Sequence, residues 1–551
     1  MKYRPNDEQK SVVSSNDPVV VVAGGAGTGK TITAVSAARA HLEAADKWLQ
    51  ALRCAAEKAG ARAVLPARQR VLFLSFSRTA IAQIVDRAGE VIGPHGPRLE
   101  VATFHGFAWR IISAFGSSHG FAPPLTVLSS ANMRVPGAPK GLTYEQLIPA
   151  ARSLLAIRRV SDHYSSRYGL VICDEFQDTD AQEWQFLQLI APRARRILLG
   201  DVNQSIYGGF KPGVDAATRI ASALSIPGAQ QIDLPPASYR DPSGVLPAAA
   251  EAARRRRFND PALRVAASTG RLTITQMTDD RGYAQVIDLA RQARHHGHSV
   301  SIFTHTNTAT TELSDALTAA GLIHEQVGFG EAYGEALAAQ LALVQYALGD
   351  DSAPVLRALA VYITATQRGK GLSPLARQML TPANNPALER ALAQLATDLR
   401  ASVNPLNLEL LADTVAGAYG RIGTFRGQET WLQAAQRTRN KLQIRRGEQG
   451  IAAIMADLLQ VRDESLVGNL ANRRRPIQVM NLHQTKGREA DTTILLLGSD
   501  EFYGCEDEPY PEGSRLLYVV MTRARKQSHL VVPAIAHPLW QPLIAVCRSV
   551  I

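Results

Sequence analysis

Residues 19–31 read VVVVAGGAGTGKT. The four valines predict a buried strand, and the segment after them matches G-x-x-x-x-G-K-[ST], the pattern of a phosphate-binding loop. Glycines let the backbone curl tightly and point its N–H groups at phosphates, and a helix beginning near Lys30 adds its positive dipole end. We expect Lys30 to neutralise the β- and γ-phosphates and Thr31 to ligate Mg²⁺. The loop residues expected to contact the nucleotide are Gly24, Gly25, Ala26, Gly27, Thr28, Gly29, Lys30 and Thr31.

An acidic segment far along the chain supplies what the loop lacks. Residues 170–178 read LVICDEFQD, an apolar run followed by Asp174 and Glu175. A carboxylate at the end of a buried strand can reach the same Mg²⁺, and its neighbour can polarise the attacking water. A solvated strand end is the alternative, which the presence of the loop motif in the same chain makes much less favourable. We therefore predict that Asp174 ligates Mg²⁺, that Glu175 is catalytic, and that the site hydrolyses Mg-ATP.

Composition limits the class of protein. The chain has 551 residues, so several domains are expected. A net charge of +11 and a pI near 9.6 weakly favour a polyanionic partner such as nucleic acid. Four cysteines without a C-x-x-C pair argue against a metal ribbon or a disulfide framework and suit a reducing compartment. Because no signal core and no apolar run near ~20 residues is present, we expect a cytoplasmic protein without membrane contact.

Strand-like runs alternate with helical stretches, which predicts parallel α/β sheets. One set of runs covers 19–23, 71–75, 101–103, 170–173 and 197–200, and a second covers 300–304, 477–480, 493–497 and 529–532. The Ala-rich stretch 43–70 is expected to be a helical insertion. We predict a first α/β domain at 1–112 and 168–234 with an inserted domain at 113–167, and a second at 235–349 and 475–551 with a reduced helical insertion at 350–474.

The acidic segment also resembles a family motif. Asp174 to Asp178 resembles the D-E-x-Q-D box of the UvrD/Rep/PcrA-like superfamily 1A DNA helicases. Seven further segments resemble the other boxes of that family in the same order: PNDEQ at 5–9, SFSRTA at 75–80, TFHGF at 103–107, GDVNQSIY at 200–207, SYRD at 238–241, HQTKGRE at 483–489 and YVVMTRA at 518–524. The resemblance implies two RecA-like P-loop domains, each carrying a mainly helical insertion.

The same resemblance implies roles around the nucleotide. Gln9 would read adenine and Tyr239 would stack on it, while Glu489 would touch the ribose or the DNA side of the cleft. Gln204 would sense the phosphate. Arg240 and Arg523 would reach the γ-phosphate from the second α/β domain, where arginines stabilise charge on the transferred group. A surface role is the alternative for both arginines.

The expected DNA track is less specific. Base stacking is expected from Phe76, Phe104, His105, Tyr207 and Phe210, phosphate contact from Arg78 and Lys211, and a DNA contact from His483. Phe104 and Phe107 could equally be core residues. Phe210 departs from the family pattern, because Lys211-Pro212-Gly213 follows it where the family has Arg-Gly-Ala. The arginine runs 254–257 and 473–475 could steer nucleic acid, although a solvated helix face is the more frequent role of such runs.

The sequence therefore predicts an ATP- and Mg²⁺-dependent enzyme that moves on single-stranded DNA and unwinds duplex at junctions with it. The 3′-to-5′ direction comes from the resemblance alone. A first alternative is an ATPase subunit that works with a nuclease or another protein in repair or defence without unwinding by itself. Two weaker alternatives are a nucleic-acid-binding regulatory switch with little turnover and an RNA-directed enzyme.

Overall fold

The computed structural model describes residues 5–59, 69–76, 81, 84–85, 89, 91–121, 125–206, 213–327, 330–367, 371–403, 408–423, 426–444, 451–467, 475–485, 487–498, 511–535 and 540–548. Two compact units divide the chain. We call Met1–Phe104, Ala151–Val327 and Ala471–Ile551 the sheet unit, and His105–Ala150 with Gly328–Leu470 the helical unit. Both units are therefore built from chain segments that are distant in sequence.

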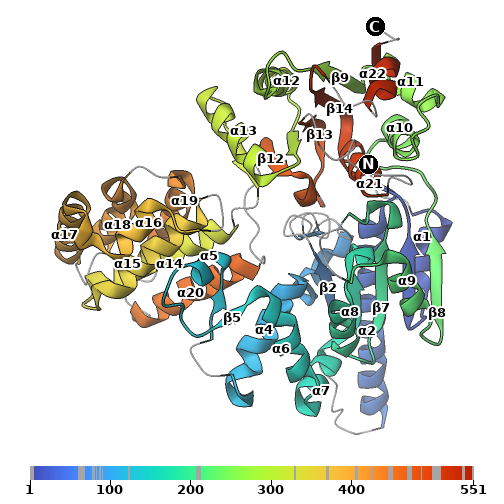
Figure 1. Cartoon of the computed structure of the whole chain (residues 1–551). Coiled ribbons are helices and arrows are strands. Elements are labelled where there is room, and N and C mark those ends of the chain that lie inside the picture. The colour runs from blue at the N-terminus through green and yellow to red at the C-terminus, as the bar shows by residue number, and fades with distance from the viewer. Residues whose placement is uncertain are drawn as a thin grey trace. The chain divides into compact units, whose positions relative to one another are not determined.

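The first sheet of the sheet unit is wholly parallel and has the order β3-β2-β6-β7-β1-β8. Its strands β2, β7 and β8 are labelled in Figure 1. Most of its strands are buried along their length, as strands covered on both faces are. Because β7 lies between β1 and β6, the loop after β1 and the acids after β6 emerge at the same edge, with one strand end between them. The strands are β1 (Val19–Ala23), β2 (Arg70–Ser75), β3 (Leu99–Thr103), β6 (Tyr168–Cys173), β7 (Arg195–Gly200) and β8 (Ala229–Asp233).

The second sheet is also parallel, in the order β11-β12-β10-β13-β14-β9. Its strands are β9 (Leu272–Gln276), β10 (Val300–Thr304), β11 (Glu325–Gln326), β12 (Ile477–Asn481), β13 (Ala490–Leu496) and β14 (Ala524–Val532). The predicted α/β class with two RecA-like sheets is confirmed, and every strand-like run named from the sequence overlaps a strand. Within these two sheets, the strands that the sequence did not indicate are β8, β9 and β11; they lie at sheet edges, where polar residues replace the apolar run.

Helices flank both sheets of the sheet unit. Those of its first part are α1 (Asp7–Ser14), α2 (Lys30–Lys58), α7 (Arg158–Arg167), α8 (Ala181–Leu189) and α9 (Ala216–Leu224). Those of its second part are α10 (Val245–Arg254), α11 (Pro261–Ser268), α12 (Tyr283–His295), α13 (Asn307–Ala319), α21 (Pro511–Met521) and α22 (Gln541–Arg548). The helices α4 (Phe104–Phe115) and α6 (Tyr144–Leu155) cross the boundary between the two units.

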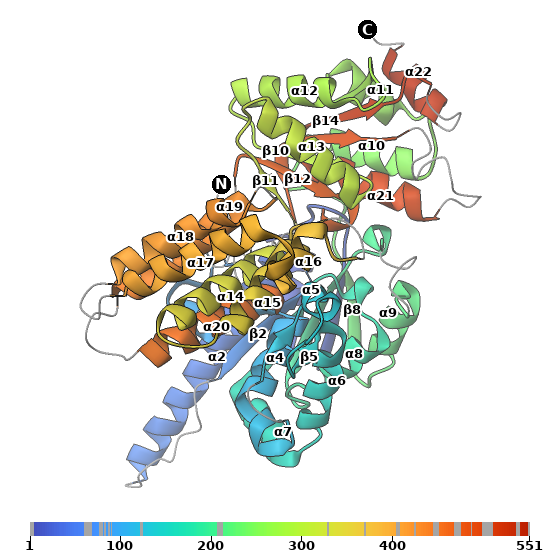
Figure 2. The same cartoon turned by 60° about the vertical axis from the view of Figure 1, so that its left-hand side comes forward.

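Helix α2 includes the described part of the stretch that was expected to be a helical insertion. Residues 43–58 are helical and continue the loop helix without a break (Figure 2). No glycine or proline interrupts Lys30–Lys58, and alanine, leucine and glutamine favour a helix throughout. The last turns are exposed, because they extend past the sheet that buries the first ones.

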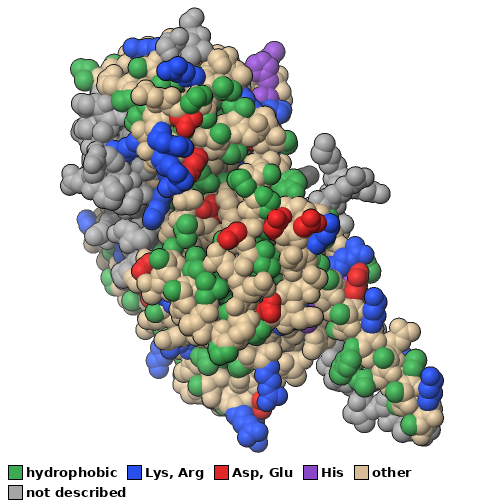
Figure 3. All heavy atoms as spheres, turned by 90° about the vertical axis from the view of Figure 1, so that its right-hand side faces the viewer, with side chains coloured by type: hydrophobic (Ala, Val, Ile, Leu, Met, Phe, Trp, Pro, Cys, Tyr) green, Lys and Arg blue, Asp and Glu red, His purple; other side chains and the backbone are tan. Residues whose placement is uncertain are grey.

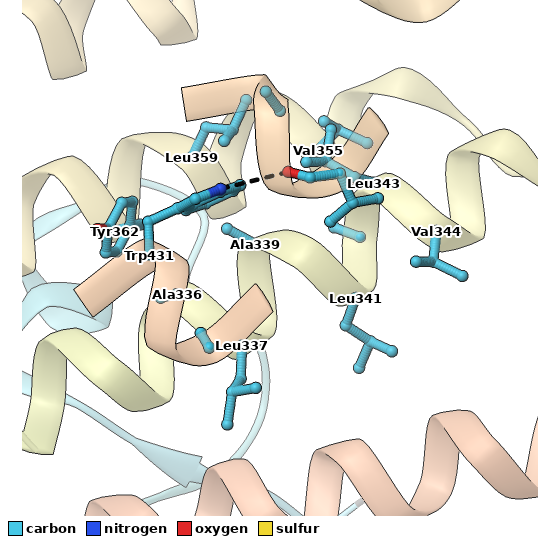
Figure 4. Close-up of a cluster of buried hydrophobic side chains, with 14 of the residues drawn as sticks. Ala336, Leu337, Ala339, Leu341, Leu343, Val344, Val355, Leu359, Tyr362 and Trp431 are labelled. Carbon is cyan, nitrogen blue, oxygen red and sulfur yellow. Dashed lines mark hydrogen bonds between the residues drawn. The ribbon is translucent and has the colours of Figure 1, made fainter. Parts of the chain in front are cut away.

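The helical unit has its own apolar core. It consists of α5 (Ser130–Arg134), α14 (Gly330–Ala347), α15 (Ser352–Ala365), α16 (Pro374–Leu380), α17 (Pro386–Ala401), α18 (Glu409–Ile422), α19 (Gln428–Ile444) and α20 (Ile451–Val467), with the short parallel pair β4 (Val127–Leu128) and β5 (Leu142–Thr143). Trp431 is fully buried against Tyr362, and its Nε1 donates hydrogen bonds to Val415 O at 3.2 Å and Ala416 O at 3.1 Å (Figure 4). The unit starts its second segment at Gly328, ahead of the predicted boundary at 350.

Among the described residues, no helix combines the length and the apolar character that a membrane span requires.

Candidate nucleotide and nucleic-acid sites

The loop between β1 and α2 has the geometry of a phosphate cradle. Gly27 has φ 79° and Gly29 has φ 87°, a conformation that other residues rarely adopt. A Cβ on Gly24 would lie 2.8 Å from Thr28 Oγ1. Gly29 is the N-cap of α2 and provides no side-chain cap, so no capping side chain occupies the first N–H groups of this long helix. A phosphate can bind such a helix N-terminus through those N–H groups. The loop therefore fits the expected triphosphate.

Gln9 and Tyr239 approach the same glycine from different parts of the chain. Gln9 is fully buried in a capping box with Asn6, and its Nε2 donates to Thr28 O at 3.2 Å. A Cβ on Gly29 would lie 2.9 Å from Gln9 Nε2 and 3.3 Å from the Tyr239 ring. Because Tyr239 is 52% exposed, its ring is accessible for stacking. The two residues predicted to read adenine thus meet at the end of the loop.

The first helical residues of α2 hold the predicted cation and metal ligand. Lys30 Nζ donates to Gly24 O and, at 2.9 Å, to Gly25 O. Thr31 follows on the first turn and is partly exposed. Asp174, at the end of β6, is 8% exposed, and its Oδ1 accepts from Glu175 N at 3.0 Å. Hydroxyl and carboxylate oxygens are the ligands that Mg²⁺ prefers, so Thr31 and Asp174 are chemically suited to the role predicted for them.

Glu175 has a strained backbone. Its φ of 53° is in the left-handed region, which costs a glutamate on the order of 1–3 kcal/mol. Its Oε2 accepts from Gln177 Nε2 at 2.6 Å. Strain of this kind persists where the surroundings fix the backbone, and it is frequent at functional sites. The conformation therefore agrees with the catalytic role predicted for Glu175.

The thiol of the neighbouring Cys173 is unreactive. Cys173 is fully buried, and burial together with the surrounding carboxylates holds its pKa well above the usual range of a thiol. The thiol stays protonated and is not a nucleophile.

Polar residues connect the first sheet to the second. Gln204, in the short helix η4 (Val202–Gln204), donates from Nε2 to Asp201 Oδ2 at 2.6 Å, and its Oε1 accepts from Arg523 Nη2. Arg523 lies between α21 and β14 of the second sheet. Burial and the nearby Arg240 charge lower the pKa of Arg523 to about 10, so it remains a cation at neutral pH. Gln204, predicted to sense the phosphate, thus contacts Arg523, predicted to reach the γ-phosphate.

Arg240 lies on the connection between β8 and α10. Its Nη2 pairs with Glu489 Oε1 at 2.7 Å, and its Nη1 donates to Thr522 O at 2.6 Å. Its Nε is buried and has no hydrogen-bond partner among the described residues. A Cβ on Gly27 would lie 3.2 Å from Arg240 Cβ, which brings the arginine next to the phosphate loop. This unsatisfied donor beside the loop suits an anionic ligand.

Glu489 forms ion pairs with two arginines. Besides Arg240, it accepts from Arg525 Nη2 at 3.1 Å. Its side chain is only 6% exposed. The predicted contact with ribose or DNA remains a prediction, whereas the pairing with arginine is what the structure shows.

The sequence indicated several residues of the site only as members of a box, without a predicted role of their own. Gln177 and Asp201 lie in the hydrogen-bond network, and Tyr518 of α21 accepts at its hydroxyl from Ala26 N at 3.4 Å. Burial raises the pKa of Tyr518, so its hydroxyl stays neutral. Their positions inside the boxes are the signal by which the sequence could have indicated these residues. A box does not specify which hydrogen-bond partner each side chain contacts.

The predicted DNA track is only partly described. Phe104 is 1% exposed and lies between Phe76, with ring centroids 4.6 Å apart, and Phe186, at 6.5 Å. Phe107 is equally buried. The prediction that Phe104 stacks on a base is therefore wrong, because the start of α4 turns the Phe104 ring into the core. Phe76 is partly exposed.

His105 belongs to the helical unit and stacks on Tyr144, with ring centroids 3.7 Å apart. Arg78, Tyr207, Phe210 and Lys211 lie outside the described residues, as does the side chain of His483. Their DNA contacts remain predictions.

The first arginine run pairs with acids of its own region. Arg254 and Arg255 both contact Glu251, and Arg257 lies 3.3 Å from Asp260. On the face that Figure 3 presents, basic side chains are likewise interspersed with acidic ones. This favours the solvated-helix alternative for the run. Of the second run, only Arg475 is described.

Comparisons with known proteins point in one direction. The profile of a family described as an AAA domain matches residues 9–210. DNA helicase II of Escherichia coli (strain K12) is 23% identical over 305 residues, which cover 44% of this chain and 39% of that protein. DNA helicase II of Salmonella typhimurium (strain LT2) is 24% identical over the same shares. The match thus spans well under half the length of each curated relative. With the two parallel sheets, the loop and the ordered boxes, these similarities support the resemblance of this chain to UvrD-like proteins of helicase superfamily 1.

Proposed function

We propose that the chain hydrolyses Mg-ATP to move 3′-to-5′ along single-stranded DNA and to separate duplex at a junction. The observation that carries this proposal is that residues of both sheet regions lie at the phosphate loop and beside it. Tyr518 of α21, which flanks the second sheet, accepts from Ala26 N of the loop at 3.4 Å, and Arg523, which follows α21, contacts Gln204 after β7. Hydrolysis in such an arrangement alters contacts of both sheets at once, which is the basis of movement driven by domain closure.

Each residue has a stated task in this proposal. Lys30 and the loop N–H groups bind the phosphates, while Thr31 and Asp174 hold Mg²⁺, which neutralises phosphate charge when bound. Glu175 orients the attacking water. Arg240 and Arg523 stabilise charge on the transferred phosphoryl group.

Phosphate release, measured with and without single-stranded DNA, tests the first step. Wild type is expected to be stimulated by DNA, and Glu175→Gln is expected to bind ATP but turn over at least ~100-fold more slowly. Arg255→Ala changes an exposed cation that is already paired with Glu251 at the end of α10; it is the control for a substitution outside the site and should keep full turnover. Wild-type turnover by Glu175→Gln would overturn the catalytic assignment.

Strand separation is measured on duplexes with a 3′ or a 5′ overhang. The proposal expects unwinding of the first only. ATPase activity that DNA stimulates without any strand separation would support the alternative in which the chain serves a nuclease or another partner. Stimulation by RNA but not by DNA would contradict the DNA proposal.

A further inference from the structure

A continuous line of hydrogen bonds joins Glu175 to Arg523. Gln177 Nε2 donates to Glu175 Oε2 at 2.6 Å, and Gln177 Oε1 accepts from Asp201 N at 3.1 Å. Asp201 Oδ2 then accepts from Gln204 Nε2 at 2.6 Å, and Gln204 Oε1 accepts from Arg523. The line starts after β6, passes the end of the neighbouring β7, and reaches the second sheet.

Both glutamines are held in one orientation. Each amide faces a carboxylate with its NH₂ group and an N–H donor with its oxygen. A flipped amide would place oxygen against carboxylate and NH₂ against a donor, which leaves four groups unsatisfied. Gln177 is fully buried and Gln204 is 4% exposed, so water does not readily replace these bonds.

Gln177 also has a close backbone neighbour. A Cβ on Gly200, the last residue of β7, would lie 3.5 Å from Gln177 Oε1. The amide therefore packs directly against the end of the strand that carries Asp201. A side chain wedged in this way can fix the position of the strained Glu175 two residues earlier.

We propose that Gln177 and Asp201 are positioning residues, which hold the Glu175 carboxylate and connect its position to Arg523 of the second sheet. This inference rests on the proposed ATPase function. In this inference Gln177 positions Glu175, and Asp201 links Gln177 to Gln204. Nucleotide binding by the loop does not require this line, because the loop residues take no part in it.

Gln177→Glu tests the link with little change in shape. It keeps an oxygen for Asp201 N–H but puts a carboxylate against Glu175. We expect kcat to fall on the order of 10- to 100-fold, while KM and the affinity for a fluorescent ATP analogue stay within about twofold. Gln182→Glu, on the exposed surface of the next helix, is the control for added charge and should match wild type.

A double-mutant series tests the connection to the second sheet. If Gln177 and Gln204 act as one line, Gln177→Ala with Gln204→Ala lowers kcat little further than either change alone. Multiplicative losses would overturn the connection, and wild-type kcat in Gln177→Glu would overturn the positioning role. A wild-type protein without ATPase activity would instead overturn the proposed function itself, so the two failures are distinguishable.

Discussion

Replacing Arg462 by methionine should destabilise the helical unit strongly. The guanidinium satisfies Glu335 and Asp463, which are 2% and 5% exposed, together with Thr126 and Val127. Methionine fills much of the volume but leaves the two carboxylates buried without their shared cation. Breaking a buried ion pair from one side costs about 3–5 kcal/mol, far more than the hydrophobic gain from the new side chain returns.

The carboxylates also make this loss depend on pH. Burial raises the pKa of Asp463 to about 6, above its ordinary value of 3.8. Because the folded state holds this proton more tightly, the contribution of Asp463 to stability is complete below pH ~4 and is lost as pH rises through about 6. Without Arg462, Asp463 loses the charge and the hydrogen bond that lower its pKa, so its carboxyl favours protonation still more. The penalty of Arg462→Met should therefore be smaller at pH 5 than at pH 8.

Hydrogen exchange of peptides from α14 and α20 measures the free energy of opening within this unit, without assuming two-state unfolding of the whole chain. Arg439→Met is the matched control, because Arg439 pairs with Asp413 at a far more exposed site of the same unit. We expect the control to cost at most about 1 kcal/mol. Equal protection in Arg462→Met and wild type, or an equal penalty at both pH values, would refute the reasoning.

Three further predictions concern the sheet unit. Gly27→Val should abolish nucleotide binding in equilibrium titrations, because its φ is 79° and a Cβ would lie 2.4 Å from Ser238 Oγ; retained affinity would contradict the cradle geometry. Tyr239→Ala should raise KM for ATP on the order of 10-fold with little change in kcat, as loss of one stacking contact does, and an unchanged KM would exclude the adenine contact. Arg255→Ala should leave DNA affinity and its salt dependence unchanged in anisotropy titrations, because Arg255 already pairs with Glu251 of its own helix; a smaller salt slope would show a phosphate contact.

The sequence predicted the interior of both sheets well and their edges poorly. Apolar runs such as Val19 to Val22 can be buried on both faces only as central strands of a parallel sheet, so their assignment needs no tertiary information. Strand β8 reads AQQID and is largely exposed, so it lacks that pattern. It becomes a strand because β1 offers a partner edge.

Long-range partners were beyond the reach of the sequence. Arg462 is one of many arginines in its helical region, and nothing in its surroundings indicates that it binds Val127, 335 positions earlier. The two insertions were therefore predicted as separate domains. Phe104 shows the same difficulty on a smaller scale, because a box position allows either a core ring or a base contact, and packing on Phe76 and Phe186 decides.

In the candidate site, the motifs predict the roles of residues, and the structure gives the contacts between them. The boxes predicted roles for Glu175, Gln204 and Arg523, because each chemistry needs its residue type at its place in the chain. They did not reveal that Gln177 and Asp201 connect these residues, since a glutamine inside a motif can face solvent, core or ligand equally well. Only the hydrogen-bond geometry distinguishes these options, through the matched donors and acceptors on both amides. In a site built from such a line, the residues that contact substrate are predictable from sequence, and the residues that align them are found from the structure.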